Sequence, residues 1–269
     1  MTKPGTFRSE FSSLAGQYAR YRTSYSDDLF DTIARYTRDK KVASTTSNSV
    51  SASVRALDLA CGTGLSTAGL LARGFAVTGV DIAAGMLVEA KRSIGGDCAF
   101  YEARAESLPF ADCAFGLVTC GQAFHWFDAA ASFCEISRVL ATGGAVALFW
   151  KHGLPEDPYE ACAAGLLREI SGRAEPFNVS RAYTNRFDEF WSERRALRDH
   201  EEWRLPLDLS FTVDSFVGYH SSREIARFHL GDKREEFLTR LRANVARLAG
   251  PAAEFAVRAT QYLYLARKR

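Results

Sequence analysis

The stretch Leu57-Asp58-Leu59-Ala60-Cys61-Gly62-Thr63-Gly64 (LDLACGTG) decides the fold class of this chain. It is an apolar run that predicts a buried strand, and it ends abruptly in a glycine-rich turn. Such a turn leaves backbone N–H groups beside a ligand, and the helix that follows favours an anionic group there. In an α/β sheet the turn lies at the carboxyl end of a strand, where such folds bind ligands.

Strands and helices alternate around this stretch. Apolar and β-branched runs predict strands at 55–60, 75–80, 98–103, 115–120 and 145–150, and helical spacing predicts helices at 65–73, 84–94 and 129–140. The run Ala145–Trp150 is continuously apolar, as expected for a strand covered on both faces. Alternation of this kind predicts right-handed βαβ units and a parallel sheet.

The flanking segments divide the chain into further parts. We expect a helical lead-in over 1–40 that is broken near Thr23–Ser26, and a Ser/Thr-rich linker over 41–53. The core then covers 54–152. Residues 153–200 carry helical patterns without strands, 200–212 predict a sixth strand, and 214–248 look helical, so 153–250 is interpreted as a helical cap. Residues 251–269 contain a closing strand at 260–265.

Composition limits the partners that the chain can have. Its 269 residues carry a net charge of +2, too small to suggest nucleic acid. The first residues, MTKPGTFRSEF, contain no apolar segment of a signal peptide, and no apolar run reaches about 18 residues. We therefore expect a cytoplasmic protein with no membrane partner.

The cysteines are predicted to be reduced thiols in the core. No C-x-x-C pair or histidine cluster occurs, so no metal site is expected. A catalytic cysteine remains the weaker alternative. The six cysteines are Cys61, Cys98, Cys113, Cys120, Cys134 and Cys162.

A carboxylate follows the strand after the glycine turn. Asp81 stands where it can accept hydrogen bonds from both hydroxyls of a ribose, which predicts a nucleoside-containing cofactor. The G-x-G-x-x-G fingerprint of a nicotinamide or flavin dinucleotide site does not fit, because Thr67 stands at the third glycine. No G-K-[ST] follows, so a P-loop does not fit either. A structural turn without a ligand is the remaining alternative.

With these segments in place, the chain resembles the class I S-adenosylmethionine-dependent methyltransferases. The resemblance rests on LDLACGTG, VTGVDIAAGML at 77–87, AESLPF at 105–110 and HWFDAAASFCEISRVLATGG at 125–144. YARYRTSY at 18–25, AFHWF at 123–127, FVGYHS at 216–221 and YLYLAR at 262–267 are similar to the subgroup of trans-aconitate methyltransferase. The resemblance implies a Rossmann-like fold: a seven-stranded, mostly parallel sheet with helices on both faces and a helical cap.

The resemblance also implies a role for individual positions. Asp58 would orient the methionine amino end of the cofactor, Asp81 would bind the ribose, and Arg104 departs from the acidic residue usual at its position. Further departures are Thr23 and Ser26, where relatives have prolines, and Gly116, where they have Asp. The implied cofactor-binding set is Tyr18, Arg22, Asp58, Ala60, Gly62, Gly64, Asp81, Ile82, Met86, Ala105, Glu106, Gln122 and Ala123.

The sequence says less about the methyl acceptor than about the cofactor. A carboxylate acceptor needs no general base, whereas a phenol or amine acceptor would. His125 is the candidate base, with a structural role as the alternative. Tyr21, Trp126, Lys151 and Tyr219 are predicted to contact the acceptor. Other candidate groups are the cations Arg22, Arg181 and Arg223 and the imidazoles of His152 and His220.

The predicted activity is methylation of a small molecule, with O-methylation of a small carboxylate as the first expectation. The alternatives are N- or C-methylation, a protein that binds the cofactor without catalysis, and a nicotinamide oxidoreductase. The protein is expected to be a monomer or a homodimer.

Overall fold

The computed structural model describes residues 4–39, 53–96, 98–172, 196–223 and 230–269, with side chains from residue 11 onward. Except for Ser53, the expected linker at 41–53 lies outside these ranges, as does Arg181. The helices are α1 (Pro4–Tyr21), α2 (Asp27–Arg38), α3 (Leu65–Leu71), α4 (Ala84–Ile94), α5 (Ala129–Val139), α6 (Pro158–Ser171), α8 (Val213–Ser221) and α10 (Arg234–Ala249), with 3₁₀ turns η1 (Phe124–Trp126) and η3 (Gly231–Lys233).

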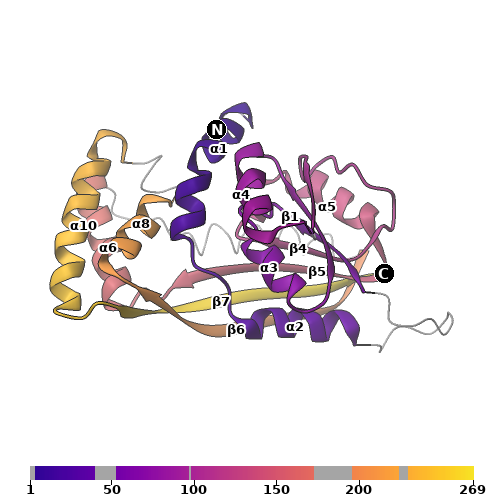
Figure 1. The fold of residues 1–269 in the computed structure, drawn as a ribbon. Helices are drawn as coiled ribbons and strands as arrows, with labels where there is room; N and C mark the ends of the chain where they lie inside the picture. Colours follow the sequence, from indigo (N-terminus) through magenta and orange to yellow (C-terminus); the bar gives the residue numbers. More distant parts are fainter. Residues whose placement is uncertain (1–3, 40–52, 97, 173–195, 224–229) are drawn as a thin grey trace.

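A seven-stranded sheet runs through the molecule in the order β3-β2-β1-β4-β5-β7-β6 (Figure 1). The strands from β3 to β5 pair in parallel, and β7 pairs antiparallel with both of its neighbours. This confirms the mostly parallel sheet expected from the sequence. The strands are β1 (Arg55–Leu59), β2 (Ala76–Asp81), β3 (Ala99–Glu102), β4 (Phe115–Gly121), β5 (Leu140–Gly153), β6 (Leu197–Phe211) and β7 (Phe255–Lys268).

Helices cover both faces of the sheet because successive strand side chains point to opposite sides. Along β5, Val146 and Leu148 pack in one buried cluster with Ile136 of α5. The alternate residue Phe149 packs in a second cluster with Ile33 of α2 and with residues of α3. Helices on both faces are therefore confirmed, and the continuous apolar pattern of β5 is explained by burial on both sides.

The far halves of β6 and β7 extend beyond this core and carry α6, α8 and α10 (Figure 1). Leu209 of β6 and Val257 of β7 share a buried cluster with Leu166 of α6, Phe216 of α8 and Leu241 of α10. This part is the helical cap, and β6 is the strand expected within it. None of the described helices is both long and apolar enough to cross a membrane.

The strands near the cap differ from expectation in length. β5 begins at Leu140 instead of 145, and β6 begins at Leu197, inside a stretch expected to lack strands. Leu140, at the start of β5, pairs with Phe115 of β4. The length of β6 comes from its long antiparallel pairing with β7, in which even Glu202 and Arg204 have partners, Tyr264 and Tyr262. A pattern of polar residues on an edge strand conceals such pairing, because their side chains face solvent.

Candidate functional site

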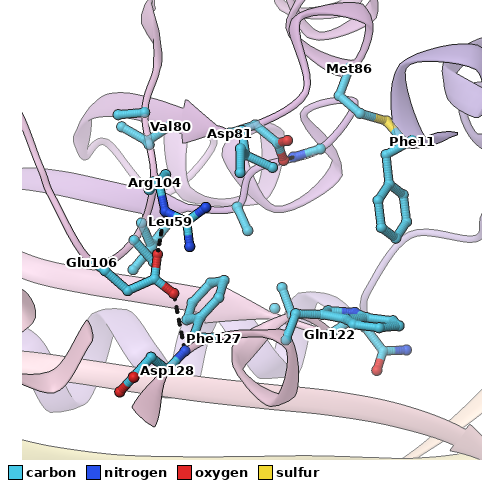
Figure 2. Close-up of a pocket in the computed structure, with 18 of the residues that line it drawn as sticks. Phe11, Leu59, Val80, Asp81, Met86, Arg104, Glu106, Gln122, Phe127 and Asp128 are labelled. Atoms are coloured by element: carbon cyan, nitrogen blue, oxygen red, sulfur yellow. Dashed lines mark hydrogen bonds and ion pairs between the residues drawn. The ribbon is translucent and has the colours of Figure 1, made fainter. Parts of the chain in front are cut away.

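A cavity of about 490 Å³ lies at the carboxyl ends of β1, β2 and β4, with α1 on its open side (Figure 2). Its volume is within the range of small-molecule sites, roughly 300–1,000 Å³. It is lined by Phe11, Tyr18, Leu59, Ala60, Gly62, Val80, Asp81, Ile82, Met86, Ala103, Arg104, Ala105, Glu106, Gly121, Gln122, Ala123, Trp126, Phe127 and Asp128.

The glycine turn forms one edge of this cavity. Ala60 and Gly62 line it, and both have a positive φ, 55° and 56°. Gly64 does not line the cavity; it starts α3, and a Cβ added there would lie 3.0 Å from Ile94 Cγ1. Of the two glycines, Gly62 faces the ligand space, whereas Gly64 allows α3 to pack closely against α4.

Asp81 closes the end of β2 beside the turn. Its Oδ2 accepts a hydrogen bond from the Gly62 N–H at 2.9 Å, and its Oδ1 accepts one from the Ala83 N–H at 2.9 Å. Burial raises the pKa of Asp81 to about 6. Each carboxylate oxygen keeps a further lone pair for a ligand, so the side chain is oriented as an acceptor for a pair of hydroxyls.

Asp58 lies elsewhere than the resemblance implies. It is fully buried outside the cavity lining, where its Oδ2 accepts hydrogen bonds from the hydroxyls of Ser66 at 2.7 Å and Thr67 at 2.6 Å. Thr119 donates to its Oδ1 at 3.0 Å. In this structure Asp58 therefore ties β1 to α3 and β4. One of these bonds comes from Thr67, which stands where the G-x-G-x-x-G pattern has its third glycine.

The far wall of the cavity is apolar with one polar corner. Ile82, Met86, Ala105 and Phe127 line it as expected, together with Leu59 and Val80, which the sequence analysis did not single out as ligand contacts. At the corner, Arg104 Nε lies 3.3 Å from Glu106 Oε2, and Glu106 Oε1 accepts from the Asp128 N–H (Figure 2). Arg104 thus pairs with Glu106 and positions it at the cavity.

α1 covers the cavity from outside the sheet. The Gly85 N–H at the start of α4 donates to Ser12 Oγ at 3.2 Å, which holds α1 against α4. Phe11 and Tyr18 of α1 then line the cavity, and the Phe11 ring meets Trp126 edge-on with centroids 6.0 Å apart. Trp126, expected near the acceptor, is part of this aromatic closure.

The end of β4 forms the floor between the cavity and β5. Gln122 has a φ of 59°, which is unusual for a residue other than glycine. Its Nε2 donates to the Lys151 carbonyl at 3.0 Å, and its N–H donates to the Phe149 carbonyl at 2.8 Å. Gln122 and Ala123 thereby reach the cavity as predicted from the resemblance.

His125 does not line the cavity. The Trp150 indole Nε1–H donates to its Nδ1 at 3.4 Å, and its ring lies 4.9 Å from the Trp126 ring. The Nδ1 lone pair is therefore engaged by Trp150 and is not directed at the cavity. The geometry corresponds to the structural alternative for His125 rather than to a general base.

Lys151 also departs from its expected role. Its ammonium is buried and donates to the backbone carbonyls of Thr23 and Ser24, the latter at 2.7 Å, so it does not reach the cavity. Burial, with a smaller effect of Arg22, lowers the pKa of Lys151 to about 7. Lys151 fixes the segment that joins α1 to α2.

The other lead-in and cap residues lie just outside the cavity lining. Tyr21 packs against Gly218 of α8, where an added Cβ would lie 2.4 Å from its ring. The Arg22 guanidinium lies 4.4 Å from the centroid of Tyr18 and 5.5 Å from that of Tyr219. Arg22 is thus next to the cavity through Tyr18, on the side of the cap.

A parallel sheet with a ligand-facing glycine turn and an acidic residue at the end of the next strand defines an α/β protein with a nucleoside-type site. A family model described as a methyltransferase domain matches residues 57–148. A demethylmenaquinone methyltransferase from Clavibacter sepedonicus is 30% identical over 210 residues, 72% of this chain and 80% of that protein. The chain belongs to the class I S-adenosylmethionine-dependent methyltransferase family.

Other similarities cover different shares of the chain. An uncharacterized methyltransferase from Mycobacterium bovis is 33% identical over 140 residues, 52% of this chain and 51% of that protein. The chain thus spans about half the length of that relative and of two from Mycobacterium tuberculosis. A solved structure from Anaeromyxobacter dehalogenans, named as a type II methyltransferase, has a TM-score of 0.64 at 21% identity, covering 92% of this chain and 98% of that one. This likeness supports the Rossmann-like fold.

Proposed function

We propose that this protein transfers the methyl group of S-adenosylmethionine to a small molecule. The observation that carries the proposal is Asp81, a buried carboxylate oriented by the Gly62 and Ala83 N–H groups at the rim of a cavity of about 490 Å³. A cavity with one oriented carboxylate and an apolar wall fits a ribose that carries a flat, largely apolar base. Family membership supports the same cofactor.

Each part of S-adenosylmethionine is proposed to lie against its own set of residues, most of which line the cavity. We assign the ribose hydroxyls to Asp81, the adenine faces to Ile82 and Met86, and the adenine edge to Ala105 and Glu106. Ala60 and Gly62 lie against the methionine and ribose portions, Gln122 and Ala123 border the sulfonium, and Tyr18 and Arg22 close over the methionine end. The cofactor supplies a methyl group on a good leaving group, so the protein contributes mainly positioning and exclusion of water.

The acceptor is proposed to be a small carboxylate that is methylated on oxygen. A carboxylate is already nucleophilic and requires no base, and this agrees with His125, whose Nδ1 is engaged by Trp150. N- or C-methylation would require a proton acceptor at the cavity. Asp81 is already engaged by two backbone N–H groups, so it is a poor candidate for that task.

Calorimetry with S-adenosylhomocysteine tests the cofactor site. We expect Asp81→Ala to weaken binding by about 100-fold or more, because two hydrogen bonds to a charged acceptor, each worth about 1.5–3 kcal/mol, are lost. Asp208→Ala, at an exposed carboxylate on β6, is the control and is expected to bind normally. Equal binding by wild type and Asp81→Ala would overturn the assignment of this site.

Catalysis needs a separate measurement. Transfer of label from methyl-labelled S-adenosylmethionine across a panel of small carboxylates, amines and phenols distinguishes an enzyme from a protein that only binds the cofactor. We expect transfer to a carboxylate and a base-labile product, as methyl esters are. Binding of the cofactor without transfer to any member of a broad panel would favour the non-catalytic alternative.

A further inference from the structure

The outer edge of the sheet at β6 is open for pairing. β6 is the last strand in the sheet order, so only one of its two sides pairs with β7 (Figure 1). In the part of the chain that the structure describes, no strand pairs with the other side. Residues 199–204 of β6 are all exposed. An edge strand presents a row of unpaired N–H and C=O groups, to which another strand can add.

Pro206 indicates which residues direct their backbone groups outward. Proline has no N–H, and in a sheet it lies on an edge strand with its nitrogen on the solvent side. In an antiparallel ladder the backbone groups of successive residues point alternately to one side and the other. Glu202 and Arg204, in phase with Pro206, therefore direct their N–H and C=O groups outward. Trp203, between them, directs its own towards its partner Leu263 on β7.

The residues around Trp203 carry charges in an order that suits a second copy of the same strand. Glu202 precedes Trp203 and Arg204 follows it, and all three are exposed. Of the described residues, none forms an ion pair with Glu202 or Arg204; the guanidinium of Arg204 lies 5.8 Å from the centroid of Tyr262. When two copies run antiparallel with Trp203 opposite itself, Glu202 of each faces Arg204 of the other. Opposite charges directly across two strands stabilise the pairing, and like charges oppose it.

Other registers are less favourable for two copies of β6. Outward-directed residues must face each other, so a two-fold axis passes through a residue. An axis at Glu202 or Arg204 places like charges opposite each other, and an axis at Leu205 places Glu202 opposite Asp208. An axis at Pro206 pairs Arg204 with Asp208, but it places two prolines in a pair that requires both N–H groups. The register through the tryptophan avoids like charges and keeps the two prolines apart.

We propose that this chain forms a homodimer in which two copies of β6 pair antiparallel about a two-fold axis at Trp203. Trp203 of each copy, 37% exposed, packs against the other, and Glu202 and Arg204 form two reciprocal ion pairs. The bulge between Arg198 and Glu201 ends the regular strand, so the paired region is short and the dimer is weak. None of the described residues of β6 lines the cofactor cavity, and the dimer is independent of the proposed function.

Sedimentation equilibrium over a range of concentrations tests the dimer. We expect a dissociation constant on the order of 10–100 µM, so the protein is mostly monomeric at about 1 µM and mostly dimeric at about 500 µM. Added salt should weaken the association, because the ion pairs are at the surface. A mass equal to one chain throughout this range overturns the proposal and would leave the edge to a strand of a different protein.

Charge reversal tests the register. Glu202→Arg and Arg204→Glu should each weaken the association by at least about tenfold, because each places like charges opposite each other twice. The double variant Glu202→Arg/Arg204→Glu restores both pairs and should associate within about twofold of wild type. Glu156→Arg, at an exposed carboxylate outside β6, is the control with no expected effect. Association that is unchanged in the single variants, or not recovered in the double variant, overturns the proposal.

A disulfide across the axis tests the same register independently. Trp203 faces itself in a non-hydrogen-bonded pair, whose Cα atoms lie about 4.5 Å apart, within the range of disulfides. Trp203→Cys should therefore give covalent dimers under mild oxidation, linked between the two introduced thiols. Leu248→Cys, at a position 49% exposed on α10, is the control. Peptide mapping separates these links from any that involve the chain's own exposed thiols, Cys113 and Cys134.

Thermal unfolding shows whether each variant remains folded. Because the substituted side chains are exposed, all variants are expected to unfold near the wild-type temperature at about 1 µM, where the protein is monomeric. If a charge variant does not fold, the cross-link in Trp203→Cys still decides. A dimeric wild type in which Trp203→Cys gives no link between the two positions 203 overturns the proposal.

Discussion

At the scale of single residues, the proposed role of Asp81 predicts that cofactor binding depends on pH. Burial raises its pKa from an ordinary 3.8 to about 6, so the folded protein without ligand binds a proton more readily than the unfolded chain. The contribution of this group to stability is therefore lost as pH rises from about 4 to 6. Cofactor hydroxyls require the ionised carboxylate, so affinity has the opposite dependence.

We expect S-adenosylhomocysteine affinity to fall by up to about tenfold for each pH unit below 6 and to be level above pH 7. Calorimetry between pH 5 and 8 measures this dependence. Asp81→Asn, which has no carboxylate at this position, should bind weakly with a much flatter profile. An unchanged slope in Asp81→Asn would assign the pH dependence to another group.

The two glycines of the turn are predicted to respond differently to alanine. Both have positive φ, so alanine costs about 1–2 kcal/mol of stability at either position. At Gly62 the added Cβ meets no protein atom within 4 Å, so stability falls only by this backbone cost and the main effect is a loss of cofactor affinity. At Gly64 the added Cβ crowds Ile94, so the main effect is a further loss of stability. Denaturant unfolding and calorimetry on both variants check this; the reverse pattern would contradict the division of roles.

Site residues were predictable where a local pattern carries the geometry. Gly62 and Asp81 follow from a strand–turn–helix and the end of the next strand, which always meet at one sheet edge. Asp58 was assigned to the ligand because nothing local shows that hydroxyls from α3 and β4 surround it. Phe11 was missed because its place on the cavity depends on how α1 docks.

At the scale of elements, the docking of α1 on α4 brings Phe11 and Tyr18 to the cavity. A Cβ at Gly85 would lie 2.6 Å from the Ser12 carbonyl oxygen, so Gly85→Ala must move α1 away. We expect S-adenosylhomocysteine affinity to fall by about tenfold, or 1.4 kcal/mol. Stability should not fall equally, because alanine favours helix α4 by up to about 1 kcal/mol over glycine. Hydrogen exchange of α1 amides should increase.

Gly165→Ala is the matched control for this prediction. Gly165 lies within α6, and a Cβ there meets no atom within 4 Å. The same substitution should stabilise the cap helix by up to about 1 kcal/mol without changing cofactor binding. A loss of affinity in both variants would show that α1 docking is not the cause.

Element boundaries were most predictable where the sequence contains its own stop signals. The helix expected at 84–94 matches α4, which ends at Gly95 with a positive φ of 82°. The strands β5, β6 and β7 are longer than expected. Their outer parts are held by pairing across the sheet. Pairing between residues distant in sequence has no local signal, so only the apolar centres of these strands were identified.

At the scale of the whole molecule, one continuous sheet carries two separate cores. The cofactor cavity rests on β1, β2 and β4, with hydrophobic clusters on both faces. The cap has a buried cluster of its own, which includes Leu241 and Phe216. The clusters around the cavity and the cluster of the cap thus have strands β6 and β7 in common.

This division predicts that loosening the cap leaves the cofactor site intact. Leu241 is fully buried at the centre of the cap cluster, so Leu241→Ala should cost about 2–5 kcal/mol locally. Leu248, on the same helix and 49% exposed, is the matched position, and Leu248→Ala should cost at most about 0.5 kcal/mol.

In Leu241→Ala, amides of α8 and α10 should exchange faster, whereas those of α3 and α4 keep their protection. S-adenosylhomocysteine affinity should stay within about twofold of the wild-type value. Equal deprotection of α3 and α4 would show instead that the sheet unfolds as one unit and that the cap does not loosen separately from the cavity.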